Sequence, residues 1–246
     1  IDVNVTGTLN LLEESVAAKV RAFVFTSTTS TFGRSLVPAA GQPTAWIDEE
    51  TRCLPKNIYG ASKCAAEDLC ELLHRDSGLP CLILRTSRFF PEEDDLPAQR
   101  QAYGAENLKA NEFLHRRVEI EDAVEAHLLA LQRGPALGFG RYIISATPPF
   151  SRDDVVDLAA DMPAVVRRYV PAYEPLYAYR GWRMYPHLDR VYDNAKARRE
   201  LGWRPRHDFA AVVDRLVAGG ELLSPLARIV GAKGYHRPCP TSPPVG

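Results

Sequence analysis

Long apolar runs and an excess of one sign of charge are both missing from this 246-residue sequence. No stretch approaches the roughly 18 consecutive apolar residues that a membrane-spanning helix needs, so no membrane association is predicted. Lysine and arginine together number 30, aspartate and glutamate 31, and the formal net charge is −1. Because nucleic acids and anionic membranes attract strongly basic proteins, this balance gives no electrostatic reason to expect either partner.

Cysteine is scarce and poorly spaced for cross-linking or metal binding. The five cysteines contain no Cys-x-x-Cys pair, and their number is odd, so neither a zinc site nor a disulfide framework is predicted. A reducing, cytoplasmic setting is the default interpretation. The remaining composition, 46% hydrophobic and 25% charged, is that of a globular protein with one large domain, or one domain with a lobe attached.

Apolar periodicity predicts most of the regular elements. It predicts helices over residues 4–20 and 58–75 and strands over residues 21–27, 81–87 and 141–146. The positions expected to face the core are Ala61, Ala65, Leu69 and Leu72 in the second helix, and Val124, Leu128 and Leu131 in a helix that starts near Asp122. Ser151 and Asp154 form a capping-box-like start of a further helix.

The segment 35–54 has no clean period and is expected to form a loop. Its acids Asp48, Glu49 and Glu50 are expected to be solvated. Loops of about 20 residues in a compact domain are usually functional or poorly ordered.

The segment from Pro55 to Lys63 carries the clearest chemical signal. It places Tyr59 and Lys63 four residues apart in a segment that continues as a helix, so both side chains project from one helix face. A cation beside a phenol lowers the pKa of the phenol from roughly 10. The pair would then act as a general acid/base near neutral pH. Most isolated Tyr-x-x-x-Lys pairs are ordinary helix residues, so the interpretation needs support from elsewhere in the chain.

Two upstream stretches provide that support. Val24 to Gly33 is an apolar strand that runs into a cluster of hydroxyls and ends in Phe-Gly, and Asn4 to Thr8 reads Asn-Val-Thr-Gly-Thr. Together with Pro-x-x-x-Tyr-Gly-x-Ser-Lys, and in this order, they resemble the extended short-chain dehydrogenase/reductases, the NAD-dependent epimerase/dehydratase family. The resemblance covers roughly residues 2–235.

The resemblance implies an α/β fold, namely the C-terminal part of a Rossmann-type parallel sheet with a small C-terminal substrate lobe. Residues 1–150 would belong to the dinucleotide-binding domain, 151–237 mainly to the substrate-binding lobe, and 238–246 to a disordered proline-rich tail. The arginine- and tyrosine-rich segment 163–186 would cover the substrate. A homodimer is a further family expectation.

The family's Gly-rich dinucleotide fingerprint does not occur in this chain. The cluster of Gly134, Gly138 and Gly140 has the wrong spacing and precedes a strand instead of a helix. The resemblance therefore implies that the first four strands of the family's sheet are missing. The chain is expected to be the C-terminal part of a longer protein or a truncated reading frame.

The resemblance also implies roles for individual residues. Tyr59 would be the acid/base and would also contact the cofactor. Lys63 would lower the pKa of Tyr59 and bind the nicotinamide ribose. Thr28 would orient the substrate oxygen, and Asn4 would support a proton-relay water. Asn4 could instead be a helix N-cap. Thr28 could instead close its own turn, and Thr29 could be the correct register.

Four further residues complete the predicted site. Ser27 and Ser87 end two strands and are candidates for cofactor binding, since ligands gather at the carboxyl ends of parallel strands. Arg88 and Arg117, with Thr29, are candidates for substrate binding. Arg88 replaces an Asn that commonly contacts sugar-nucleotide phosphates in the family, which weakens a nucleotide-sugar interpretation. Its guanidinium could pair with a phosphate or carboxylate, or with the acidic run that follows it.

The chemistry implied is reversible hydride exchange between NAD or NADP and a carbinol carbon of a small sugar-like or hydroxy/keto substrate. Epimerase and dehydrogenase remain open. The resemblance also disfavours dehydration, because many dehydratases of the family carry an acid just after the catalytic Ser/Thr position, whereas Thr28 is followed by three hydroxyl residues and no acid. The alternative is a catalytically silent binding or scaffold protein.

Overall fold

The protein is described here by a computed structural model that covers residues 1–93 and 97–233. The proline-rich tail predicted at 238–246 lies outside the described residues. Within the described part of the chain, no helix is both long enough and apolar enough to cross a membrane.

A parallel sheet of three strands organises the fold, in the order β1-β3-β4. Its strands are β1 (Phe23–Thr28), β3 (Cys81–Thr86) and β4 (Phe139–Ile144). Every residue of β3 is buried, because β3 has a neighbour on each edge and helices on each face. That position explains why β3 reads as a continuous apolar run. The α/β class with a parallel sheet is confirmed.

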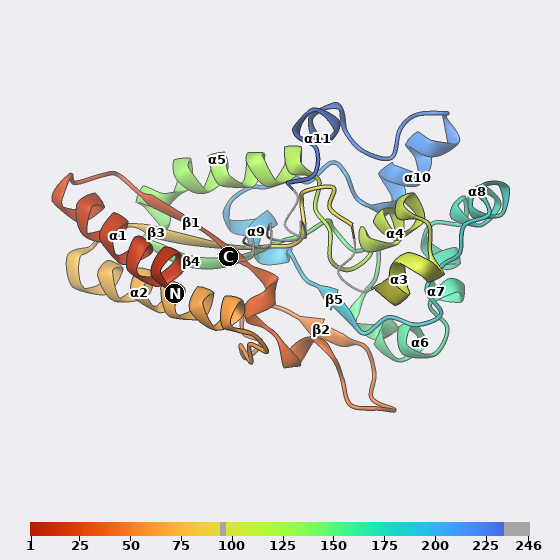
Figure 1. The fold of residues 1–246 in the computed structure, drawn as a ribbon, viewed down its shortest axis with the longest axis horizontal. Coiled ribbons are helices and arrows are strands. Elements are labelled where there is room, and N and C mark those ends of the chain that lie inside the picture. Colours follow the sequence, from red (N-terminus) through yellow and green to blue (C-terminus); the bar gives the residue numbers. More distant parts are fainter. Residues whose placement is uncertain (94–96, 234–246) are drawn as a thin grey trace, which may run out of the picture.

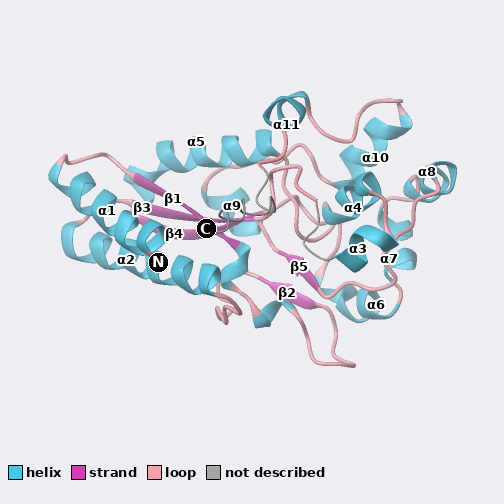
Figure 2. Cartoon of the chain, viewed as in Figure 1, coloured by secondary structure: helices cyan, strands magenta, loops and turns pink. Residues whose placement is uncertain are grey.

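Helices cover the two faces of the sheet (Figures 1 and 2). One face carries α2 (Ile58–Ser77) and α1 (Gly7–Ala17), which follows a π-helical turn at Asp2–Thr6. The other face carries α5 (Ile120–Leu137) and α9 (Ala195–Glu200). Alternate residues of β3 serve the two faces: Ile83 packs with the α1–α2 cluster, whereas Leu82 and Leu84 pack with the α5 cluster.

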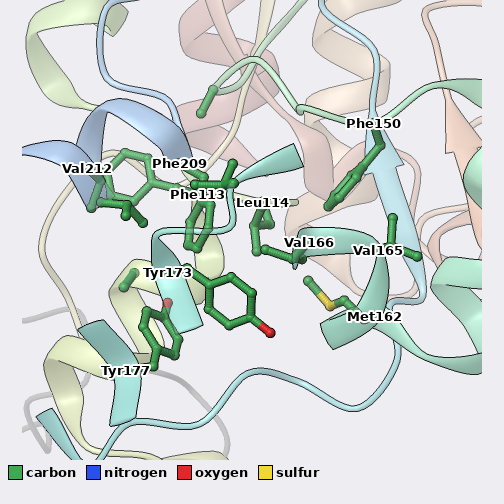
Figure 3. Packing of buried hydrophobic residues seen from close by; sticks show 14 of the residues in the cluster. Phe113, Leu114, Phe150, Met162, Val165, Val166, Tyr173, Tyr177, Phe209 and Val212 are labelled. Carbon is green, nitrogen blue, oxygen red and sulfur yellow. The ribbon is translucent and has the colours of Figure 1, made fainter. Parts of the chain in front are cut away.

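A helical lobe lies beyond the carboxyl ends of the strands (Figure 1). It consists of α3 (Pro97–Ala102), α4 (Ala105–Glu112), α6 (Val155–Ala160), α7 (Met162–Tyr169), α8 (Tyr173–Arg180), α10 (Phe209–Val217) and α11 (Pro225–Val230). A second, two-stranded parallel sheet joins β2 (Ala45–Ile47) to β5 (Arg190–Tyr192). The core of the lobe is rich in aromatic residues, with Tyr173 and Tyr177 against Phe209 (Figure 3). The capping box at Ser151 and Asp154 is confirmed.

The expected solvated loop at 35–54 is wrong in part. It contains β2, and Glu49 is partly buried, with its carboxylate accepting a 2.8 Å hydrogen bond from the backbone N–H of Ile143 on β4. Burial raises the pKa of Glu49. A strand of three residues is too short to show the alternation of apolar and polar residues by which strands are recognised. Its partner strand lies more than 140 positions away, so the pairing leaves no local signal either.

The buried faces of the two long helices also differ from the prediction. In α2 the buried residues are Gly60, Ser62, Ala66, Glu67 and Cys70. Of the positions predicted to face the core, Leu69 is partly buried, whereas Ala61, Ala65 and Leu72 are exposed. In α5 small residues such as Ala123, Ala126 and Ala130 face the sheet, while Val124, Leu128 and Leu131 are about half exposed. Both helices lie so close to the strands that mainly small side chains fit between helix and sheet. The exception is Glu67 of α2, a buried carboxylate that is paired with neighbouring side chains.

Candidate active site

Two glycines bring two of the three motif segments together. Gly33 has φ +53°, and a Cβ there would lie 2.0 Å from the carbonyl oxygen of Leu54. Gly60, in the first turn of α2, passes so close to the turn after β1 that a Cβ would lie 2.8 Å from the Ser30 carbonyl oxygen. Only glycine permits these approaches. They set the start of α2 directly against the hydroxyl-rich end of β1.

Lys63 lies one turn after Tyr59 on α2 and reaches β1. Its Nζ donates a 2.9 Å hydrogen bond to the Thr26 carbonyl oxygen and lies 4.6 Å from the centre of the Phe25 ring. Burial lowers the pKa of Lys63, and the Glu67 carboxylate opposes that shift. The amine is therefore a half-buried cation, and it contacts β1 at Thr26, two residues before Thr28. Tyr59 itself is about half exposed.

Asn4 is docked on the first turn of α2. Its Nδ2 donates to Ser62 Oγ at 3.1 Å, and Ser62 Oγ donates in turn to the Tyr59 carbonyl oxygen at 2.9 Å. Asn4 lies inside the π-helical turn, and Thr6 occupies the N-cap of α1. The alternative role of Asn4 as a helix cap is therefore wrong, and the side chain lies beside the residue that precedes Lys63.

The hydroxyls after β1 form a short 3₁₀ turn. Thr28 caps it, with Oγ1 accepting a 3.1 Å hydrogen bond from Ser30 N, while Thr31 donates back to the Thr28 carbonyl oxygen. The turn-closing role of Thr28 is thus present in the structure. It leaves the hydroxyl proton of Thr28 available, since accepting one hydrogen bond does not prevent donation of another. Thr29 is buried beside it.

The two predicted cofactor serines have different surroundings. Ser27 is buried and donates a 2.5 Å hydrogen bond to Glu67 on α2. Ser87 follows β3, and its N–H donates to the Ile144 carbonyl oxygen. Its buried Oγ has no hydrogen-bond partner among the described residues. Since buried hydroxyls are normally paired, Ser87 is the serine whose surroundings suit a ligand.

The two candidate substrate arginines converge on one buried carboxylate, Glu112, at the end of α4. Arg117 holds it through two nitrogens at 2.6 and 2.8 Å, Arg116 pairs with it at 2.8 Å, and Arg88 approaches to 3.5 Å. Arg88 also donates to the Glu93 carbonyl oxygen at 3.4 Å. Arg117 is almost fully buried and is used to support this cluster, whereas Arg88 remains partly accessible. The cluster is separate from the β1–α2 group, one strand away at the end of β3.

A pocket of about 140 Å³ borders this cluster. Its lining includes Tyr103, Lys109 and Glu112, together with Glu92, Glu93, Arg100, Ala105 and Leu108. Burial lowers the pKa of Lys109, and the nearby Arg117 lowers it further. Beside the pocket, His115 is buried against Tyr185, with ring centres 5.6 Å apart.

His115 should make the protein less stable in mild acid. Burial and the positive charges of Arg190 and Arg116 hold the pKa of His115 well below 6.5 in the folded protein. The unfolded chain therefore binds this proton first. Stability that is present above pH 6.5 is lost as the pH falls, by up to about 1.4 kcal/mol per pH unit.

Urea unfolding between pH 7.5 and 5 should show that the free energy of unfolding falls less steeply with decreasing pH in His115→Phe than in the wild type. His187→Phe, which alters an exposed imidazole, is the control, and equal slopes in wild type and His115→Phe would refute the assignment.

Several residues with evident roles were not singled out from the sequence. Glu67 and Glu112 are the buried carboxylates on which the arginines of the site converge. A signal exists for each: Glu67 follows Lys63 by four residues, and Glu112 precedes Arg116 by four. Apolar periodicity assigns acids to the exposed face of a helix, so it does not identify Glu67 or Glu112 as buried residues.

Comparisons with known proteins identify the family of the chain. A family model described as the NAD dependent epimerase/dehydratase family matches residues 1–144. A UDP-glucose 4-epimerase of Streptomyces lividans is 31% identical over 238 residues, covering 87% of this chain and 67% of the relative. A dTDP-glucose 4,6-dehydratase of Streptomyces antibioticus is 28% identical, covering 88% of this chain and 62% of the relative.

One solved structure extends the comparison to the fold. The UDP-glucuronic acid 4-epimerase of Bacillus cereus, in complex with NAD, aligns with a TM-score of 0.54 and 18% identity. The alignment covers 86% of this chain and 63% of that protein. At this identity the likeness concerns the fold alone. The chain spans between 62% and 67% of the lengths of these three proteins.

Proposed function

Because the chain belongs to the NAD dependent epimerase/dehydratase family, we propose that it takes part in NAD- or NADP-dependent epimerisation or oxidation at a carbinol carbon of a sugar-like substrate. Nucleotide sugars are the first substrates to test, since the relatives are named for UDP-glucose and dTDP-glucose. Epimerase or dehydrogenase chemistry is favoured over dehydration, because no acid occurs among the three residues after Thr28.

One observation carries the proposal, namely the position of the Lys63 amine. It is a half-buried cation beside β1, one helical turn after Tyr59 and close to the hydroxyl turn that starts at Thr28. Asn4 is held on the same turn of α2. This is the combination that a phenol needs to exchange protons near neutral pH.

Each of these residues has a defined task in the proposed reaction. The Tyr59 hydroxyl gives a proton to the substrate oxygen or takes one from it. The positive charge of Lys63 stabilises the phenolate, and the Thr28 hydroxyl orients the substrate oxygen by donating to it. The Asn4 amide supports a water that returns the proton. A nicotinamide cofactor supplies hydride exchange when it is bound.

The residues present suit the nicotinamide end of such a cofactor. Lys63 offers a donor at the edge of β1, and the buried Ser87 hydroxyl at the end of β3 has no protein partner in the described chain. On the substrate side, the guanidinium of Arg88, whose side chain is 21% exposed, has the geometry to pair with an anionic group. Substrate binding by Arg88 is part of the proposal.

Cofactor binding through Lys63 can be tested directly. Titration of the protein with NADH and NADPH, followed by calorimetry, should give saturable binding to one of them. Lys63→Met should weaken that binding about tenfold or more, because a hydrogen bond from a charged donor contributes about 1.5–3 kcal/mol. Lys56→Met, which alters an exposed lysine just before α2, is the matched control. If the wild-type protein binds neither cofactor, the result favours a silent binding or scaffold protein.

A further inference from the structure

Glu67 is a buried acid in the layer between α2 and the sheet. It follows Lys63 by one helical turn, and it is 2% exposed. Burying a carboxylate is unfavourable unless it is fully paired. Each described strand of the main sheet contributes one partner to Glu67, and this arrangement is independent of any ligand.

The three partners have specific geometry. Ser27 of β1 donates at 2.5 Å, and Arg85 of β3 donates through Nη2 at 2.7 Å and through Nε at 3.1 Å. Arg141 of β4 approaches at 3.3 Å. Three points of attachment across three strands fix both the rotation of α2 about its axis and its position along the sheet. That position determines where Tyr59 and Lys63 stand relative to Thr28, the neighbour of Ser27.

The partners are themselves held in place. Arg85 donates to the Glu49 carbonyl oxygen, and its guanidinium lies 5.0 Å from the centre of the Phe32 ring. Arg141 also pairs with Glu71 of α2 at 2.7 Å and lies 5.1 Å from the centre of the Phe139 ring. The attachment is therefore rigid, and Glu67 cannot leave it without exposing two guanidiniums to an apolar layer.

Glu67 also supplies the main negative charge near the Lys63 amine. The groups around that amine are the Phe25 ring and the Thr26 carbonyl of β1, and Glu67 and Cys70 of α2. Burial lowers the pKa of Lys63, and Glu67 is the strongest opposing influence, followed by Cys70. The guanidiniums of Arg85 and Arg141 lie on the far side of Glu67. Without the negative charge of Glu67 to offset them, their positive charges would lower the pKa of Lys63, as burial does.

We propose that Glu67 is a positioning residue for the Tyr59–Lys63 pair. It holds α2 in register with the end of β1 through Ser27, and its carboxylate favours the charged form of the Lys63 amine. The catalytic meaning of this role rests on the proposed function. The electrostatic link between Glu67 and Lys63 is independent of the proposed function.

The link can be measured without turnover. The chain has six lysines, so protein labelled with ¹³C at lysine Cε gives few NMR signals, and Lys63→Arg identifies the one required. In Glu67→Gln the pKa of Lys63 should fall by on the order of one unit, because a carboxylate is lost and two guanidiniums lose their partner. Glu67→Asp should move it by less. Glu71→Gln removes a partner of Arg141 but leaves the Ser27 and Arg85 contacts, so it should have little effect.

A variant of opposite sign covers the case in which Glu67→Gln does not fold. Arg141→Met removes a partly exposed cation near Glu67 and should raise the pKa of Lys63. An unchanged Lys63 titration in Glu67→Gln, or in Arg141→Met, would overturn the proposal.

In an active protein, the alkaline limb of the kcat/KM profile should move to lower pH in Glu67→Gln. A structural role alone would lower the rate without moving the limb. If Tyr59→Phe retains full activity while the Lys63 pKa still shifts, the enzyme assignment fails and the electrostatic link stands.

Discussion

Replacing Tyr59 with phenylalanine is expected to lower kcat/KM by about 10²–10⁴-fold, because the variant keeps the ring and loses the only proton that the proposed acid/base exchanges. The residues that hold the site in shape are untouched: Asn4 still contacts Ser62, and Lys63 still reaches β1. Affinity for the reduced cofactor should therefore stay within a few-fold of wild type. Steady-state rates with a nucleotide-sugar substrate, together with cofactor titration, measure both quantities.

The control for Tyr59→Phe is Tyr179→Phe. Tyr179 is 89% exposed on α8, so this change removes a phenol far from the β1–α2 group and should leave the rate unchanged. A Tyr59→Phe protein with undiminished kcat/KM would show that the Tyr-Lys pair is not the acid/base. An equal loss in both variants would point to a general effect of removing a phenol.

The parts of the fold that the sequence predicts well are those determined by local signals. The apolar run of β3 identifies a strand that is covered on both faces. The helix predicted over residues 58–75 ends two residues later, at Ser77, where Gly78 adopts the left-handed conformation typical of a helix C-cap. Gly33 and Gly60 were recognised as parts of a motif, and the structure supplies the reason: each permits a backbone approach that a Cβ would block.

The parts that could not be predicted depend on contacts between distant residues. Glu67 is buried because Ser27, Arg85 and Arg141 come from three different strands, and no local pattern brings those residues together. An apolar-periodicity argument assigns an acid to the surface, so it does not place Glu67 on the inner face of α2. Glu112 differs in part, because its closest partners, Arg116 and Arg117, are only four and five residues away, and only Arg88, 24 positions away, is distant.

Glu112→Gln should destabilise the protein by about 3–5 kcal/mol, the usual cost of removing one member of a buried ion pair. Glu112 is 1% exposed, and three guanidiniums point at it. A glutamine keeps the shape but cannot neutralise them, so like charges are left together in a buried position. Urea unfolding at pH 7.5 should show a lower midpoint with an unchanged m value. Glu106→Gln changes a side chain on the same helix that is 61% exposed and pairs with Arg180 at 3.6 Å. It should change stability by at most about 1 kcal/mol.

The pH dependence of this difference identifies its cause. Burial alone would raise the pKa of Glu112, but the surrounding arginines outweigh burial and hold the pKa below its usual 4.5. A carboxyl with a lowered folded-state pKa contributes stability that is fully present above about pH 4.5 and is lost as the pH falls through the folded-state value. The gap between wild type and Glu112→Gln should therefore be constant from pH 8 to about 5 and should narrow in stronger acid. A gap that stays constant down to the pH of acid unfolding would mean that packing, and not charge, makes Glu112 necessary.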